Sequence, residues 1–242
     1  MQQADRQLFK FALIICISCS VLLSFAAASL RGIQEQKVEL DRKINVLKAF
    51  GVQVADEKGK RIPAEEVYGI FSNHISEVII EADSGEVREG ASSSTVDRKE
   101  VAAKKLLPLY LWKEDGEVQK YAFPISGKGL WSTIYGFMAL EKDLASIVGV
   151  TFYKHGETPG LGGEVEQSWY QSQFEEGKKM MDNGEVVPMR SIKGGVASRY
   201  PDGNPHAIDG ISGATITGDG VARFITEDFK RYNSYFKTIR DS

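Results

Sequence analysis

The chain has 242 residues, of which 26% are charged and 42% are hydrophobic, so its bulk is neither disordered nor wholly membrane-embedded. Its 30 Lys and Arg and its 33 Asp and Glu give a formal net charge of -3, which excludes the basic surface that a nucleic-acid-binding protein needs. Both cysteines, Cys16 and Cys19, lie in an apolar N-terminal segment. The remainder therefore has no thiol for a disulfide, a cysteine-ligated zinc or an iron–sulfur cluster. The three histidines are scattered and match no metal-binding motif.

Residues 11–30 form an apolar run without an ionisable side chain. This length matches the ~20 residues that an α-helix needs to cross the hydrocarbon core of a bilayer. We therefore predict an N-terminal tail at 1–10 and a transmembrane helix at 11–30. A cleaved signal peptide is the alternative, because Ala26, Ala27 and Ala28 resemble a cleavage site. The apolar run is longer than the ~7–15 residues of a signal core, which favours a retained anchor.

Basic residues flank this segment unequally. Arg6 and Lys10 precede it, and four basic residues follow it closely: Arg31, Lys37, Arg42 and Lys43. By the positive-inside rule, this count places the rest of the chain in the cytoplasm. The segment itself offers no ionisable group for an ion pathway, so the chain alone is not expected to transport an ion.

Residues 31–52 are predicted to form an amphipathic connector that leaves the membrane. Leu40, Ile44 and Leu47 recur at helical spacing, and Gly51 provides a helix stop. The remaining residues, 53–242, are long enough for one globular domain.

The elements of this domain follow in chain order. Pro63 begins a helix, and 77–82 predicts a strand whose turn at 83–85 suggests a hairpin. The segments 109–113 and 118–125 flank Asp115 and Gly116, a strong hairpin signal. Further strands are predicted at 130–140 and 147–153, and helices at 169–181, before Asn183 and Gly184, and at 221–236. Runs of strands with few helices between them predict an α+β fold with a mainly antiparallel sheet and flanking helices.

Two glycine-rich loops, 155–163 and 209–220, are candidate binding elements, and a weaker one covers 127–131. The second loop runs into the last predicted helix, so Thr217 or Asp219 can cap that helix. The free N–H groups and partial positive charge of a helix N-terminus favour a phosphate. Gly213 and Ala214 leave room for a phosphate to approach the backbone. The alternative interpretation is an ordinary glycine-rich turn.

Other functional motifs are absent or incomplete. The sequence has no P-loop, and the glycines at 127 and 129 lack the third glycine of a dinucleotide-binding fingerprint. The segment around Ser212 misses the G-x-S-x-G pattern of serine hydrolases by one residue. A hydrolase that uses Ser212 would also need a histidine base, so it is kept only as an alternative.

The residues Asp209, Ser212, Gly213, Ala214 and Thr215 resemble the attachment motif of the FMN-binding domain family. In that family the final threonine is esterified through the FMN phosphate, and a dedicated flavin transferase installs the group from FAD. Residues 40–51, 127–144 and 149–165 further resemble the C-subunit family of sodium-translocating NADH:quinone oxidoreductases. The resemblance covers most of the chain and is patchy at 87–118.

The resemblance implies that Thr215 carries a covalent FMN, and that Asp209 and Ser212 serve recognition by the transferase or contact the phosphate. The first glycine-rich loop is expected either to approach the isoalloxazine ring or to be a structural turn. Its candidate contact residues are Glu157, Thr158, Gly160, Leu161 and Gly162. Trp131 is expected either to stack on the flavin or, in the alternative that we favour, to be an ordinary core tryptophan.

The resemblance also implies a single-pass protein of the bacterial inner membrane with a periplasmic flavin domain, opposite to the orientation from the charge count. Its partners would be other subunits of a respiratory complex, the flavin transferase and the lipid bilayer. The flavin would relay electrons from NADH-derived centres towards quinone in a sodium-pumping complex, and the isolated chain is not expected to be catalytic. The G subunit of the homologous Rnf ferredoxin:NAD oxidoreductase and a secreted small-molecule-binding protein are the alternatives.

Overall fold

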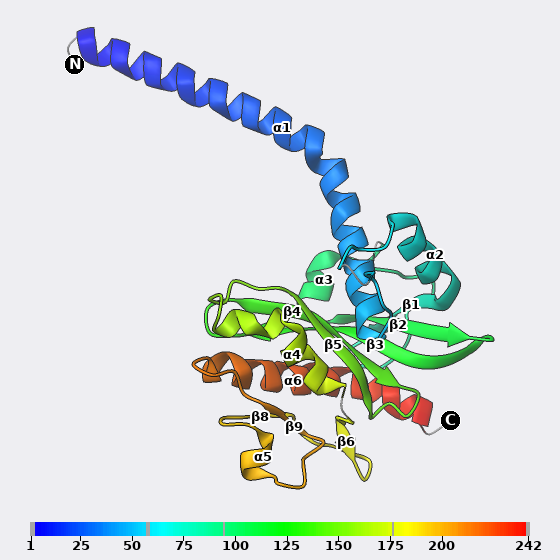
Figure 1. The fold of residues 1–242 in the computed structure, drawn as a ribbon. Helices are drawn as coiled ribbons and strands as arrows, with labels where there is room; N and C mark the ends of the chain where they lie inside the picture. Colours follow the sequence, from blue (N-terminus) through cyan, green and yellow to red (C-terminus); the bar gives the residue numbers. More distant parts are fainter. Residues whose placement is uncertain (1–2, 57–58, 94, 176, 241–242) are drawn as a thin grey trace. The chain divides into compact units, whose positions relative to one another are not determined.

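The computed structural model describes residues 3–56, 59–93, 95–175 and 177–240 (Figure 1). The chain divides into two units, Met1–Arg42 and Lys43–Ser242. Helix α1 (Gln3–Ala49) begins in the first unit and ends in the second.

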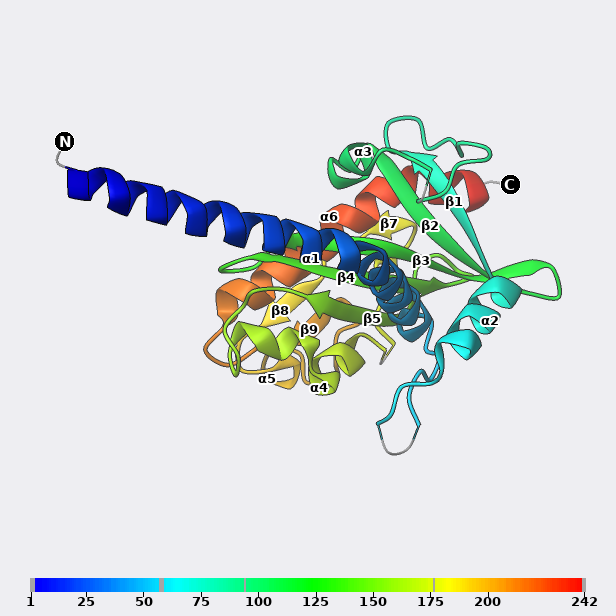
Figure 2. The ribbon, with the colours of Figure 1, turned by 90° about the horizontal axis from the view of Figure 1, so that it is seen from above.

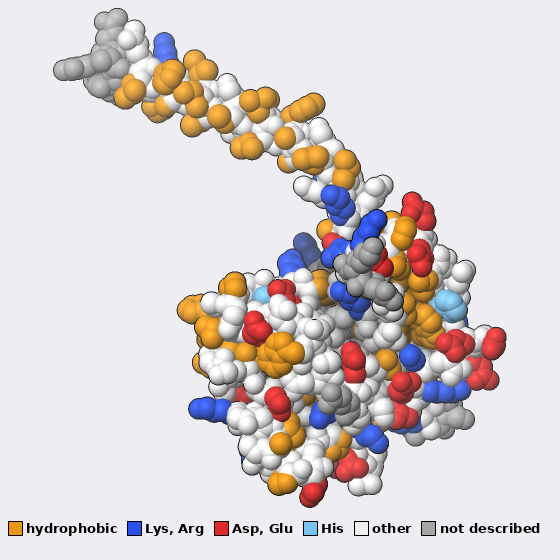
Figure 3. All heavy atoms as spheres, in the orientation of Figure 1, with side chains coloured by type: hydrophobic (Ala, Val, Ile, Leu, Met, Phe, Trp, Pro, Cys, Tyr) orange, Lys and Arg blue, Asp and Glu red, His pale blue; other side chains and the backbone are white. Residues whose placement is uncertain are grey.

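The part of α1 in the first unit has exposed apolar side chains along its length (Figure 3). They include Leu8, Phe11, Leu22 and Phe25. Among the described residues, Arg6–Ala49 is the one helix that is long and apolar enough to cross a membrane by length and composition, criteria that a signal sequence also meets. The predicted span at 11–30 lies within this helix.

The last turns of α1 belong to the core of the second unit. Ile44, Val46 and Leu47 are buried there. The helix stops as predicted near Gly51, whose N–H donates to the carbonyl of Lys48 at 2.9 Å.

The second unit is built on a five-stranded sheet in which every pair of neighbouring strands is antiparallel. The strands lie in chain order: β1 (Ile75–Glu81), β2 (Leu106–Glu114), β3 (Glu117–Lys128), β4 (Thr133–Glu141) and β5 (Ile147–Lys154). The predicted α+β class with a mainly antiparallel sheet is confirmed. The predicted hairpin at Asp115 and Gly116 is also confirmed, with φ of 50° and 84° at the two turn residues, as a two-residue turn with the right twist requires.

Helices cover both faces of the sheet (Figures 1 and 2). Helix α6 (Thr215–Arg240) lies on one face, where Phe123 of β3 packs against Tyr232 and Phe236. The last turns of α1 and helix α2 (Ala64–His74), which follows Pro63 as predicted, lie on the other face. The sheet is therefore buried on both sides, and its edges and loops remain for function.

The remaining elements are short. They are α3 (Arg98–Ala102), η1 (Gly162–Glu166), α4 (Ser168–Gln171), η2 (Ser172–Phe174), β6 (Met181–Asp182), β7 (Glu185–Val186), β8 (Arg190–Ile192), α5 (Val196–Arg199) and β9 (Ala207–Asp209). Strands β8 and β9 form a parallel pair beside α6.

Two predicted elements are much shorter than expected, whereas the last helix, predicted at 221–236, spans Thr215–Arg240. The helix at 169–181 is reduced to α4 and η2, because the chain beyond them turns to bond the end of the sheet: the N–H of Ile147 donates to Lys178 O, and the N–H of Met180 donates to Ala145 O. The hairpin after 77–82 is reduced to a bridge between Ile80 and Val87, because β1 pairs along its length with β2 instead.

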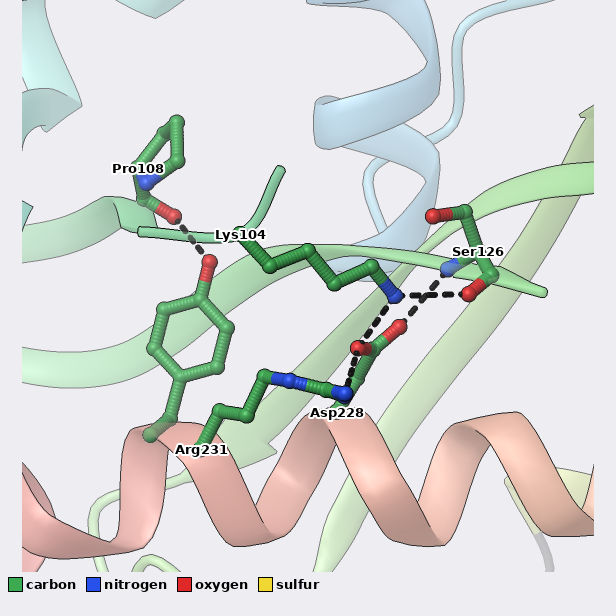
Figure 4. Close-up of polar contacts among 6 residues, drawn as sticks. Lys104, Pro108, Ser126, Asp228 and Arg231 are labelled. Atoms are coloured by element: carbon green, nitrogen blue, oxygen red, sulfur yellow. Dashed lines mark hydrogen bonds and ion pairs between the residues drawn. The ribbon is translucent and has the colours of Figure 1, made fainter. Parts of the chain in front are cut away.

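A buried carboxylate fixes α6 to β3. Asp228 of α6 accepts from the Ser126 N–H at 2.8 Å and from Arg231 at 2.9 Å, and it pairs with Lys104 at 2.5 Å (Figure 4). Lys104 also donates to the Ser126 carbonyl at 2.7 Å. One turn away on the same side, the hydroxyl of Tyr232 donates to the carbonyl of Pro108 at 2.7 Å. These bonds set the position of α6 along the sheet, and with it the position of the first turn of the helix.

Candidate functional site

The site begins where the second glycine-rich loop becomes α6. Gly213 has a φ of 74°, a conformation that glycine adopts without strain, and the N–H of Ala214 donates to Ile211 O at 3.0 Å. The helical bonding then starts with the Gly218 N–H, which donates to Ala214 O at 3.1 Å. The first N–H groups of α6 therefore have no acceptor within the helix and carry its partial positive charge. Thr215 is the first residue of the helix and is exposed.

The prediction that Thr217 or Asp219 caps this helix was wrong. Because α6 begins at Thr215, both residues lie inside the helix. The Thr217 side chain is fully buried, and its hydroxyl donates to Glu157 at 2.8 Å instead.

Asp209 bonds the attachment loop to neighbouring elements. Its carboxylate accepts from the N–H of Val196 at 2.5 Å, and its own N–H donates to Gln173 at 2.6 Å. The next residue, Gly210, donates its N–H to Ile192 O at 2.9 Å. Asp209 thus joins α5, η2 and the β8–β9 pair beneath the loop, which makes it a residue that positions the loop.

A hollow of about 460 Å³ opens beside Thr215. Its wall includes Ser212 and Gly213 from the attachment loop, and Lys193 from the loop after β8. Ser212 is exposed, and Ala214 is buried beneath it. The hollow therefore combines an exposed hydroxyl, the backbone donors at the start of α6, the Lys193 cation and the Asp209 carboxylate.

Glu157 joins the two glycine-rich loops. It is 5% exposed and accepts from the backbone N–H groups of Leu130, Trp131 and Ser132 at 3.1, 3.0 and 2.9 Å. The Ser132 hydroxyl at 3.2 Å and the Thr217 hydroxyl complete its bonding. We name these contacts the Glu157 clamp. It ties the β3–β4 turn, the first glycine-rich loop and the first turn of α6 together.

The clamp holds Glu157 as a carboxylate. Burial acts to raise its pKa, but the hydrogen bonds from Thr217 and from the backbone N–H groups of Ser132, Trp131 and Leu130 outweigh burial. The net pKa of Glu157 lies below its ordinary value of 4.5. Space at the clamp is tight: a Cβ on Gly162 would lie 2.8 Å from Glu157 and from Thr217.

The rest of the first loop turns outward. The N–H groups of Leu161 and Gly163 donate to Thr158 O at 3.2 and 2.9 Å, which closes a tight turn with Gly160 at its exposed tip. Leu161 is 43% exposed, and its Cδ2 lies 2.9 Å from the place that a Cβ on Gly213 would occupy. The structure therefore brings the two predicted loops together, with Leu161 beside the attachment loop.

Exposed apolar side chains lie beside Thr215 and on a neighbouring turn. Trp169 lines the same hollow as Thr215, Ile216 follows Thr215 in the chain, and Leu161 lies against Gly213. Leu130 and Trp131 are exposed on the turn held by Glu157. Trp131 is 67% exposed, so the alternative that it is an ordinary core tryptophan was wrong. Large apolar groups that are exposed beside a hollow indicate a binding surface.

Sequence reasoning missed several residues of this site. Trp169 of α4 and Lys193 of the loop after β8 line the hollow beside Thr215, and no helical or strand periodicity marks them. The glycine pair after Lys193 was the available signal, because it permits the loop after β8 to pass close to the attachment loop.

The arrangement defines a domain that can hold a phosphate-bearing ligand at a helix N-terminus, and the comparisons identify its class. A family model described as FMN-binding domain matches residues 129–227, which include the Glu157 clamp and the attachment loop.

The C subunit of the Na(+)-translocating NADH-quinone reductase of Vibrio alginolyticus is 34% identical over 251 residues, covering 94% of this chain and 92% of the relative. Its counterpart in Yersinia pestis is 34% identical and covers 86% and 82%. The crystal structure of Shewanella oneidensis NqrC matches with a TM-score of 0.68 at 30% identity, over 84% of this chain and 97% of that chain. The crystal structure of the C subunit of the Na(+)-translocating NADH-quinone reductase of Parabacteroides distasonis matches with a TM-score of 0.71 at 27% identity. The match covers 85% of this chain and 96% of that chain. The chain belongs to the C-subunit family of the Na(+)-translocating NADH-quinone reductases.

The residues around Thr215 fit an FMN. The free N–H groups at the start of α6 and the Lys193 ammonium offer donors and positive charge for its phosphate. Gly210 and Gly213 line the hollow and add no side chain to it. The exposed apolar side chains of Leu161, Trp169 and Ile216 offer surface for a planar ring.

Proposed function

We propose that the chain carries FMN as a phosphate ester of Thr215 and relays electrons within a sodium-translocating NADH:quinone reductase complex. The exposed hydroxyl of Thr215 on the positive end of α6, beside an open hollow, is the observation that carries the proposal. FMN accepts one or two electrons and can therefore pass electrons between different centres.

The chain's own residues position the group. Thr215 supplies the ester oxygen, and the helix N-terminus stabilises the phosphate charge by roughly 0.3–1 kcal/mol. The Glu157 clamp fixes the turn that carries Trp131 and the helix turn that carries Thr215. A flavin held in this way is tethered without being enclosed, which suits exchange of electrons with a partner protein.

We further propose that residues 11–30 anchor the protein in the bacterial inner membrane, with the flavin domain on the periplasmic side. Support for the anchor comes from the exposed apolar surface of the first part of α1. We assign the flavin domain to the periplasm because the family resemblance implies it. The count of basic residues favours the opposite orientation, but by an excess of only a few residues. A flavin transferase, the other subunits and the lipid bilayer are the proposed partners. The family assignment favours this role over that of an Rnf G subunit.

The experiment for attachment is Thr215→Ala, expressed together with a flavin transferase. A phosphate ester needs the side-chain oxygen, so flavin fluorescence that survives acid precipitation and denaturing electrophoresis should be lost completely. Thr133→Ala removes an exposed threonine hydroxyl elsewhere and should retain the fluorescence. Flavin bound to denatured Thr215→Ala protein would refute the assignment. A wild-type protein that releases all its flavin in acid would instead support binding of a free ligand.

The relay itself is tested by mixing the purified flavinylated chain with NADH. The sequence has no dinucleotide fingerprint, so the flavin absorbance should bleach slowly or not at all, whereas dithionite should bleach it at once. Rapid bleaching at ordinary NADH concentrations would show a hydride-accepting enzyme and would contradict the relay.

A further inference from the structure

A second hollow, of about 490 Å³, lies along α6 and is lined by four basic side chains from three elements. Arg190 comes from β8, Arg199 from α5, and Arg223 and Lys230 from α6. We name it the α6 groove. Its volume lies within the ~300–1,000 Å³ typical of small-molecule sites.

The charges of the groove are not balanced internally. Asp219 and Glu227 also line it, so four cations stand against two carboxylates. All six side chains are exposed, and within the described part of the chain none of the six forms an ion pair. Cations that converge on a concave surface raise the local concentration of anions. The groove is therefore complementary to a ligand with at least two negative charges.

The floor of the groove is apolar. Met189, Ile192 and Ala222 line it and are 4%, 6% and 4% exposed. The hydroxyl of Thr226, also in the wall, is already bonded to the Ala222 carbonyl and the Met189 N–H. This lining suits a ligand with a planar ring and a phosphate group. The ring can lie on the apolar floor, and each guanidinium group can donate two parallel hydrogen bonds to two oxygens of the phosphate.

The α6 groove adjoins the hollow beside Thr215. Asp219, Arg223 and Lys230 follow Thr215 at helical spacing and lie on the same face of α6. Ser191 lines both hollows, and its Oγ lies 2.7 Å from the position of a Cβ on Gly218. The two hollows thus lie end to end along one helix face.

We propose that the α6 groove binds a nucleotide, with the phosphates on Arg190 and Arg223 and the base over the apolar floor. The same chemistry can come from a free nucleoside diphosphate or from the nucleotide half of a dinucleotide. The site is separate from Thr215 and does not depend on attachment of a flavin there.

The test is calorimetric titration of the full chain in detergent with ADP, pyrophosphate and adenosine at low and moderate salt. ADP should bind more tightly than pyrophosphate, and adenosine should bind least. The double variant Arg190→Ala/Arg223→Ala should weaken ADP binding at least about tenfold, and added salt should weaken it in the wild type. A wild type that does not bind ADP would overturn the proposal.

The matched control is Arg88→Ala/Lys142→Ala, which removes two cations from exposed ion pairs with Glu81 and Glu117. Such exposed pairs contribute little to stability, so the control should fold and should bind ADP as the wild type does. Equal loss in both double variants would mean unspecific attraction and would also overturn the site.

Two further measurements are needed. Competition titrations distinguish a free nucleotide from the nucleotide half of a dinucleotide, and a Thr215 variant distinguishes the groove from the flavin attachment site. If FAD competes with ADP and FMN does not, the groove accepts the nucleotide half of a dinucleotide; if neither competes, it accepts a free nucleotide. Competition by FMN, alone or together with FAD, means that the groove accepts any planar ring that carries a phosphate, which includes nucleotides. Each of these results supports the site. Thr215→Ala should bind ADP normally, so loss of covalent flavin and loss of groove binding are measured independently.

Discussion

The two faces of α6 differ in what their polar residues contact. On the face towards the sheet, the carboxylate of Asp228 is bonded to Lys104, Ser126 and Arg231. On the other face, Thr215 and Arg223 are exposed beside the two hollows. A helix that is fixed on one side can present a reactive hydroxyl on the other with little freedom to move. Breaking contacts on the first face should therefore cost stability, whereas changes on the second should alter binding alone.

The largest expected effect is that of Asp228→Ala. The substitution removes the carboxylate that pairs with the Lys104 ammonium and accepts from the Ser126 N–H, and loss of one partner of a buried ion pair costs about 3–5 kcal/mol. The free energy of unfolding, measured by urea denaturation with tryptophan fluorescence, should fall by that amount. Glu227→Ala, on the exposed face next in the chain, should change it by less than about 0.5 kcal/mol. Equal effects of both substitutions would remove the contrast between the faces.

An intermediate effect is expected from Gly220→Ala. A Cβ at this position would lie 2.4 Å from the carbonyl oxygen of Lys128, so helix and strand must separate. Such overpacking costs about 1–3 kcal/mol, against a gain of up to about 1 kcal/mol in helix propensity. Gly69→Ala in α2 is the matched control, since nothing lies within 4 Å of its Cβ position, and it should leave stability unchanged or raised. A stabilised Gly220→Ala protein would show that α6 does not pack this closely.

A comparable or smaller effect is expected from Glu157→Gln, which removes the charge of the clamp and replaces one of its acceptor oxygens with an amide nitrogen. Weaker hydrogen bonds should lower the free energy of unfolding at pH 7 by about 1–2 kcal/mol. Because folding lowers the pKa of Glu157 from 4.5, its stabilisation is complete above that value and is lost as the pH falls through the folded-state pKa. The wild type should therefore lose more stability than Glu157→Gln between pH 6 and pH 3.

Urea midpoints across this pH range measure the difference. Glu185→Gln makes the same substitution at an exposed site and should change stability at pH 7 by less than about 0.5 kcal/mol. Parallel pH profiles for the wild type and Glu157→Gln would contradict a carboxylate clamp.

Local sequence signals predicted much of the fold. The Asp115-Gly116 turn and the strands on either side of it are encoded within a few residues, and the structure has them. The helix at 169–181 failed because bonds of Lys178 and Met180 to the end of the sheet outweigh the helical spacing of apolar residues there. Those bonds depend on the position of Ile147 and Ala145, which no local pattern contains.

The site follows the same rule: its local loops could be predicted, and the contacts between distant residues could not. The attachment loop and the first glycine-rich loop were identified, and the structure brings Leu161 of one against Gly213 of the other. The bond between Thr217 and Glu157 could not be predicted, since both side chains have local alternatives, such as a helix cap for Thr217. The exposure of Trp131 follows from the same clamp, which holds its backbone at the edge of the domain.

The Glu157 clamp has a consequence for the order of folding. Its bonds to Leu130 and Thr217 join residues that are 27 and 60 positions apart in the chain. Contacts between such distant residues form only after the intervening loops have closed, so they form later than hairpin turns and helices. We therefore expect the surroundings of Thr215 to become ordered after the hairpins and helices during refolding. A modifying enzyme that recognises this arrangement would then act only on chains in which the two glycine-rich loops have come together.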